Sequence, residues 1–172
     1  MSATVGQRVE LPWRNLAGYH CFGCCPDNPA GLALSASLEG DILVCSFALD
    51  KRQESYPGVA HGGVVVAVLD ELMGNLLAIA HRKACFTVSM RVRFLSPLRI
   101  GETYRASARL SESGTAADDA LYDTLGEIVD VEGQAMLTAS ATYCWMTQAQ
   151  ADAFMSPSPT RSAEFTGYFR RP

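Results

Sequence analysis

The longest hydrophobic stretch of the chain begins at Gly62 and Gly63 and continues to Ala80, with apolar residues at most positions. Two adjacent acids, Asp70 and Glu71, lie in its middle. A helix that is apolar on nearly every side is normally buried on every side, so the pattern predicts a buried helix at about residues 62–81. Because an uncompensated buried carboxylate costs several kcal/mol (about 3–5 when its partner is lost), an acid kept there favours a functional role.

The rest of the chain alternates between hydrophobic and polar residues, which is typical of half-buried strands. A hairpin turning at Gly40-Asp41 is expected before the helix, and four strands are expected after it. The six strands are expected at about 32–38, 42–49, 85–95, 102–112, 119–131 and 134–146. In the first strand after the helix, Thr87 shares a face with the arginines and points away from the helix. A β-bulge, or a place at a subunit boundary, would be needed to bring Thr87 to the helix.

A single apolar helix must bury its surface against other elements, and an antiparallel sheet that curls round the helix can bury it. We therefore expect one α+β domain over residues 21–146, in which a long central helix is wrapped by a curved antiparallel sheet of five to six strands. Residues 1–20 are expected to be irregular. Residues 147–172 are expected to form a tail with a short helix and a mobile end.

Composition narrows the classes of partner. The chain has 172 residues and a net charge of −4, with no basic run, so a nucleic-acid partner is not expected. The acids interrupt the apolar stretch, so no membrane span is expected, and residues 1–13 lack the apolar core of a signal peptide. The six cysteines are then expected to be reduced, in the cytoplasm. Cys21 and Cys24 have the spacing of zinc ligands, but no second pair follows, so we expect neither a metal nor a cofactor.

The glycines and the acid together suggest acyl chemistry. Backbone N–H groups are unpaired at a helix N-terminus, and glycine lets a ligand approach them. Gly62 and Asp70 are eight residues apart, which is roughly 12 Å along a helix, whereas an oxyanion donor and a base must each lie about 3 Å from the reacting group. Two antiparallel helices from two chains would bring Gly62 of one to Asp70 of the other, so a dimer is expected.

Several motifs carry a family resemblance. They are His61-Gly62-Gly63, the acid nine residues after the histidine, the strand from Thr87 to Pro97 and the turn at Gly101. Together they resemble hotdog-fold acyl-CoA thioesterases, most closely the phenylacetyl-CoA thioesterase branch. The segments Cys21-Phe22-Gly23-Cys24 and Asn28-Pro29-Ala30-Gly31-Leu32 are similar to the entry segment of many members.

The resemblance implies a hotdog fold and roles for particular residues. Asp70 would be the general base or nucleophile, Gly62 the oxyanion-hole donor, and Thr87 a hydroxyl that places water. His61 is expected at the site, as a general acid or, more simply, as a residue that shapes the loop. Gly63, Ser55 and Thr87 are the expected substrate-binding residues, although some members have Asn or Gln where Ser55 stands. Glu71 is expected to be structural or supporting.

The predicted function is hydrolysis of an aryl- or fatty-acyl-CoA thioester by a homodimer or a dimer of dimers. A non-catalytic acyl-CoA binding or sensor protein is the alternative, favoured by the departure at Ser55. An enoyl-CoA hydratase or dehydratase is a weaker alternative. That branch resembles an Asp-x4-His arrangement, and here Asn75 occupies the histidine position.

Overall fold

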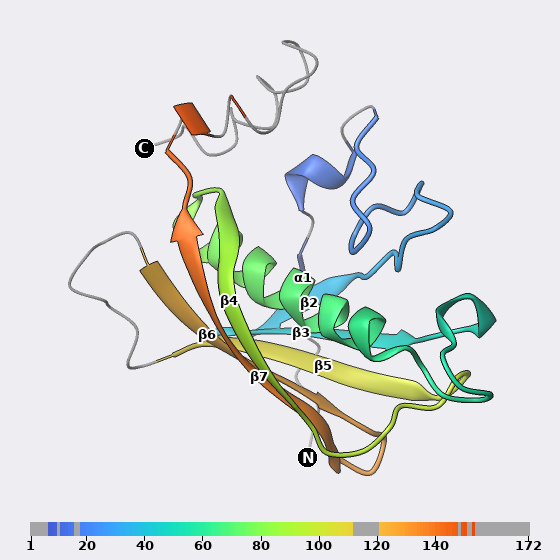
Figure 1. The fold of residues 1–172 in the computed structure, drawn as a ribbon. Helices are drawn as coiled ribbons and strands as arrows, with labels where there is room; N and C mark the ends of the chain where they lie inside the picture. Colours follow the sequence, from blue (N-terminus) through green and yellow to red (C-terminus); the bar gives the residue numbers. More distant parts are fainter. Residues whose placement is uncertain are drawn as a thin grey trace.

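The computed structural model describes residues 7–9, 11–15, 18–111, 121–147, 149–150 and 153. In this part of the chain, one long helix, α1 (Gly62–His81), packs against a single antiparallel sheet with strand order β1-β2-β3-β5-β6-β7-β4 (Figure 1). The strands are β1 (Gln7–Arg8), β2 (Ala36–Glu39), β3 (Ile42–Ala48), β4 (Cys85–Phe94), β5 (Thr103–Leu110), β6 (Leu121–Val129) and β7 (Ala135–Trp145). The α+β architecture expected from the sequence is confirmed.

Helix α1 has the bounds that the hydrophobic pattern predicts, and both ends have a local cause. His61 caps the N-terminus, because its Nδ1 accepts the Gly63 N–H at 3.1 Å. At the C-terminus, Arg82 adopts the left-handed conformation (φ 52°) and donates its N–H to the Ala78 carbonyl. By length and composition alone, α1 is also long and apolar enough to cross a membrane, but here it packs against the sheet as a core helix.

The sheet covers only one side of α1. Residues on that side are fully buried, among them Val68, Leu69 and Leu77. On the opposite side Val66 and Asp70 are only half-buried and Gly63 is exposed. The expectation that the helix is buried on every side is therefore wrong for the single chain, because the sheet does not close round it.

A β-bulge in β4 turns Thr87 toward the helix. Thr87 pairs with Tyr143 of β7 and Ser89 pairs with Thr142, so Val88 has no partner opposite and is 53% exposed. The extra residue, Val88, reverses which face of the sheet the side chains point to. The residues before Val88 therefore lie on the opposite face from the one that the two-residue period predicts. The bulge that the sequence required for Thr87 to reach the helix is present.

Strand β4 lies at one end of the sheet, and large apolar side chains are exposed along it and just after it. Phe94 and Leu95 are 56% and 47% exposed, and Phe86 is also exposed. Exposed apolar edge strands are ready to pair with another chain, and proteins normally protect them.

The N-terminal residues add structure that the sequence pattern did not predict. Gln7 and Arg8 pair with β2 as a short seventh strand, and Trp13, in a 3-10 turn (Pro12–Asn15), is buried with Cys24 and Ala78. The prediction for residues 147–172 lies almost entirely outside the described residues.

Candidate active site

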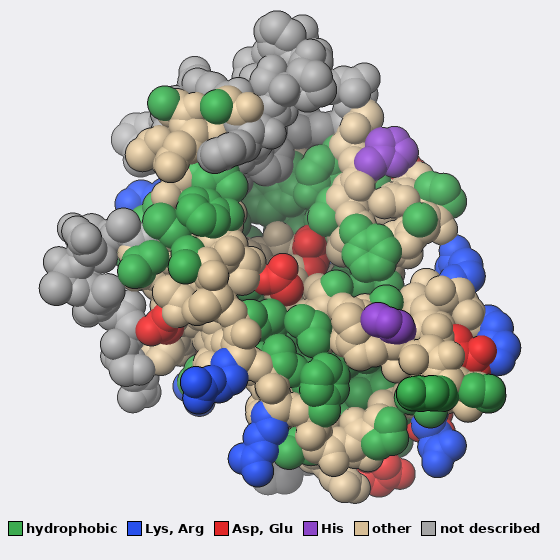
Figure 2. Space-filling view, viewed as in Figure 1, with side chains coloured by type: hydrophobic (Ala, Val, Ile, Leu, Met, Phe, Trp, Pro, Cys, Tyr) green, Lys and Arg blue, Asp and Glu red, His purple; other side chains and the backbone are tan. Residues whose placement is uncertain are grey.

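A cavity of about 280 Å³ opens beside the middle of α1. Asp70 and Glu71 line it from the helix, Thr87 from β4, Tyr143 from β7, and Tyr19 from the N-terminal segment. Figure 2 shows acidic side chains at the bottom of a hollow in this face, with hydrophobic side chains around it. The two acids of the sequence pattern therefore lie together in one cavity.

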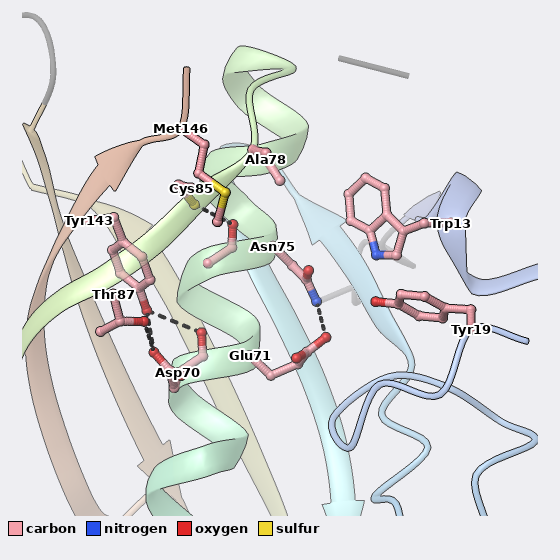
Figure 3. Close-up of a pocket in the computed structure, with 12 residues that line it drawn as sticks. Trp13, Tyr19, Asp70, Glu71, Asn75, Ala78, Cys85, Thr87, Tyr143 and Met146 are labelled. Carbon is pink, nitrogen blue, oxygen red and sulfur yellow. Dashed lines mark hydrogen bonds between the residues drawn. The ribbon is translucent and has the colours of Figure 1, made fainter. Parts of the chain in front are cut away.

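Two hydroxyl groups fix the carboxylate of Asp70 (Figure 3). The Thr87 hydroxyl donates to Oδ1 at 2.7 Å, and the Tyr143 hydroxyl lies 3.0 Å from the same oxygen and 3.1 Å from the Asp70 carbonyl oxygen. Burial, followed by the charge of Asp70, raises the pKa of Tyr143, so this phenol stays protonated and acts as a donor. No donor from the described residues reaches Oδ2. Oδ2 is therefore the oxygen that can act on a water molecule or a substrate.

Glu71 belongs to a different set of contacts, on the side of the helix that faces the N-terminal segment. Its Oε1 accepts the Asn75 amide at 2.8 Å, and its Oε2 accepts the Cys21 thiol at 3.3 Å. Burial, followed by the charge of Cys21, raises the pKa of Glu71 to about 7. A hydrogen bond from the Cys24 thiol, together with backbone N–H groups, lowers the pKa of Cys21 to about 5. The two neighbouring acids thus have separate environments.

One cysteine, Cys85, is among the residues that line the same cavity as Asp70. Burial, with the nearby charge of Asp70, raises the pKa of Cys85 to about 12. Because the thiolate is the nucleophilic form, the raised pKa gives Cys85 no support as a nucleophile.

The helix N-terminus forms a second hollow, of about 350 Å³, which Gly62, Val65 and Phe94 line. The Gly63 N–H is taken by His61, whereas no acceptor within the described residues receives the Gly62 N–H. Ser55 is exposed on the preceding loop, where its N–H donates to Val59, and it is not among the residues that line either hollow.

Within one chain, the structure therefore joins Asp70 to Thr87 and leaves the other predicted site residues apart from them. His61, Gly62 and Gly63 lie together at the helix N-terminus, where Gly62 lines a separate hollow. Sequence reasoning missed Tyr143 as a site residue. The alternation in 134–146 did place it on the inward face, and a buried tyrosine hydroxyl usually has a hydrogen-bond partner, which was the available signal.

A long helix with an acid at its centre, packed on an antiparallel sheet of this order, is the hotdog fold. Residues 57–117, which include α1, β4 and β5, match the family model of the thioesterase superfamily. The resemblance to hotdog-fold thioesterases that the sequence motifs indicated is confirmed.

Individual relatives agree with this assignment. The chain is 25% identical to acyl-coenzyme A thioesterase 13 of Mus musculus over 92 residues, which are 51% of this chain and 66% of the relative. A solved thioesterase superfamily protein has a TM-score of 0.62 at 22% identity, with 70% of this chain and 57% of that chain covered. The E. coli PaaI protein from the phenylacetic acid degradation operon has a TM-score of 0.59 at 15% identity, with 67% of this chain and 81% of that chain covered.

A Streptococcus mutans protein solved with bound acetyl-CoA has a TM-score of 0.58 at 18% identity, with 66% of this chain and 88% of that chain covered. At these identities the solved structures show the shared fold. The chain spans under two thirds of the mouse protein and of the first solved structure.

Proposed function

We propose that this protein hydrolyses acyl-CoA thioesters, with Asp70 as the general base or nucleophile and the Gly62 N–H of a second copy as the oxyanion donor. One observation carries the proposal. Asp70 Oδ1 is held by two hydroxyl groups inside a cavity, while its second oxygen is left for chemistry. A carboxylate held in this way is a pre-oriented base or nucleophile.

Thr87 and Tyr143 act through Asp70. Each donates to the carboxylate, so both fix its rotamer. Thr87 also lines the cavity, where its hydroxyl can contact the attacking water. This role agrees with the one that the family resemblance implies for Thr87.

The oxyanion donor comes from the helix N-terminus. There no acceptor in the described chain receives the Gly62 N–H, and the helix dipole favours a developing negative charge. His61 supports this arrangement by capping the helix through Gly63. In this proposal His61 orients the turn through Gly63, and Ser55, which lines neither hollow, has no assigned role.

A dimer brings the two halves together. Gly62 and Asp70 of one chain are roughly 12 Å apart along α1, which is too far for one thioester carbonyl. Edge strand β4 contacts α1, and the uncovered side of α1 and the exposed apolar residues of β4 together suit pairing with a second copy. Antiparallel pairing there would form two equivalent sites.

Acyl-CoA is the proposed substrate because the mouse relative is named an acyl-CoA thioesterase and the Streptococcus mutans neighbour was solved with acetyl-CoA. The six cysteines are all free thiols, which agrees with a reducing, cytoplasmic setting.

The test is thiol release from a panel of aryl- and fatty-acyl-CoAs, comparing the native protein with Asp70→Asn. We expect release by the native protein and a loss of at least about 100-fold in kcat for the variant, as is typical when a general base is removed. Release that survives the substitution would remove Asp70 from its role. Saturable binding without release by either protein would support the sensor alternative.

A further inference from the structure

Three metal-ligating side chains converge outside the hydrogen-bond network of Asp70. Cys21 and Cys24 approach the helix from the N-terminal segment, and Glu71 meets them from α1. The two sulfur atoms and a Glu71 carboxylate oxygen all lie within 4.8 Å of one another. The sequence offered only the cysteine pair, and the fold supplies the third ligand from 47 positions further along the chain.

The backbone around the cysteines is arranged to hold a thiolate. The Gly23 N–H donates to Cys21 Sγ at 3.3 Å, and such donation favours the ionised sulfur that binds metals. The turn is itself fixed, because Leu32 and Leu34 donate their N–H groups to the carbonyls of Phe22 and Gly23.

Gly23 lets this turn lie directly against the carboxylate. A Cβ at Gly23 would lie 2.4 Å from the Glu71 Cδ, closer than real side chains approach. On the other side, the Asn75 amide holds Glu71 Oε1 at 2.8 Å and leaves Oε2 beside Cys21. An outer hydrogen bond of this kind is how proteins orient a metal-ligating carboxylate.

The cluster concentrates acidic groups without a matching cation. Cys24 is 1% exposed and Glu71 is half-buried, and none of the ion pairs formed by the described residues involves Glu71. Zinc ligands must be deprotonated, so a divalent cation bound by the three side chains would displace the protons that these groups share and provide the missing positive charge.

The geometry points to a zinc site formed by Cys21, Cys24 and Glu71. In tetrahedral zinc sites, bonds of about 2.3 Å to sulfur and about 2.0 Å to oxygen place a sulfur and an oxygen ligand roughly 3.5 Å apart. Here the Cys21 sulfur and the Glu71 oxygen are 3.3 Å apart. Two thiolates with one carboxylate favour zinc over magnesium or calcium. The fourth position is left for a water molecule.

The site has a structural role, because it ties the N-terminal segment to α1 next to Asp70. Tyr19 lies on this segment, lines the cavity and has its hydroxyl 3.5 Å from Cys24 Sγ. A bound zinc ion therefore fixes one wall of the cavity.

The test measures metal binding directly, on reduced full-length protein and without substrate. Elemental analysis after dialysis against buffered zinc is expected to give one equivalent per chain, and cobalt is expected to produce a thiolate-to-metal charge-transfer band. Cys21→Ser, Cys24→Ser and Glu71→Gln should each weaken zinc binding by at least about 100-fold. Asn75→Ala should weaken it by about 10- to 100-fold, as other outer-shell substitutions do.

Cys25 provides the matched control. It is the neighbouring buried cysteine, its thiol donates to the Tyr19 carbonyl at 2.9 Å, and it is outside the three-ligand cluster. Cys25→Ser should bind zinc within about twofold of the native affinity. Circular dichroism identifies variants that fail to fold. If the ligand variants do not fold, the cobalt spectrum of the native protein is the result that tests the zinc site. Absence of the cobalt band, less than one equivalent of zinc, or equal loss in Cys25→Ser would each overturn the zinc site. None of these results depends on thioester hydrolysis.

Discussion

The hydroxyl of Tyr143 gives the sharpest test of how the site works. Tyr143→Phe removes a single oxygen atom, which lies 3.0 Å from Asp70 Oδ1, and retains the ring that packs against α1. The carboxylate keeps its second donor, Thr87, at 2.7 Å. The substitution therefore loosens Asp70 without emptying the cavity wall.

The size of the effect follows from the geometry. A hydrogen bond to a charged group contributes about 1.5–3 kcal/mol, and every 1.36 kcal/mol in an activation barrier corresponds to about tenfold in rate. Full loss would lower kcat by roughly 10- to 150-fold. Because Thr87 still holds the same oxygen, we expect the lower part of this range, about 10- to 50-fold, with KM changed by less than about twofold. Stability should fall by about 1 kcal/mol, a shift of roughly 2–4 °C in Tm.

The assay is thiol release under saturating acyl-CoA, with a protein-only blank because the chain itself carries six free thiols. Tyr122→Phe is the matched control, since the Tyr122 ring lies against His81 at the end of α1 and against Trp145 of β7. The control should keep kcat within about twofold. If Tyr143→Phe also stays within twofold, or falls no further than Tyr122→Phe, the role assigned to the Tyr143 hydroxyl is wrong.

Two further predictions concern α1. A Cβ at Gly74 would lie 3.4 Å from the Tyr143 ring, which is an ordinary contact. Gly74→Ala should therefore raise the free energy of unfolding by about 0.5–1 kcal/mol, measured by a denaturation curve, and slow the turnover of bulky acyl groups most. A lower free energy of unfolding would contradict this prediction. The pKa of Glu71 is raised to about 7, so the folded state binds more protons than the unfolded state between pH 4.5 and 7. The contribution of Glu71 to the free energy of unfolding therefore falls as pH rises through that window, by at most about 3 kcal/mol. In the presence of a chelator, Glu71→Gln should therefore gain stability relative to the native protein from pH 4.5 to 7.5, and parallel curves would refute the assignment.

The elements of the fold could be predicted because their patterns are local. The apolar stretch gave the bounds of α1, and the two-residue period placed Leu137, Ala139 and Tyr143 on the buried face of β7. Both patterns arise from the way side chains project from a helix or a strand. Asp70 could be predicted as a site residue because a carboxylate amid apolar residues is costly.

The remaining features depend on contacts between distant segments. The bulge at Val88 follows from the pairing of β4 with β7, which a strand pattern does not encode. How far the sheet curls decides which side of α1 stays uncovered. The hydrophobic pattern of residues 62–81 cannot show this, so it predicted more burial of α1 than the single chain has. The cluster of Cys21, Cys24 and Glu71 forms only because the N-terminal turn docks on α1. The sequence spacing predicts a second cysteine pair for a zinc site and does not indicate a carboxylate ligand.

The most direct test of the central claim is complementation between two inactive variants. Asp70→Asn removes the proposed base, and Gly62→Pro removes the proposed oxyanion N–H at a helix position where proline is well tolerated. Gly62→Ala, which keeps the N–H and meets Phe94 only at 3.5 Å, is the active control.

The two variants are unfolded together, mixed in equal amounts and refolded. Half of the dimers are then mixed, and each mixed dimer holds one intact site assembled from the two chains, so the account predicts about one quarter of the native thiol-release activity. If the mixture is no more active than the separate variants, although mixed dimers are present, the site is not shared between two copies and the account is contradicted.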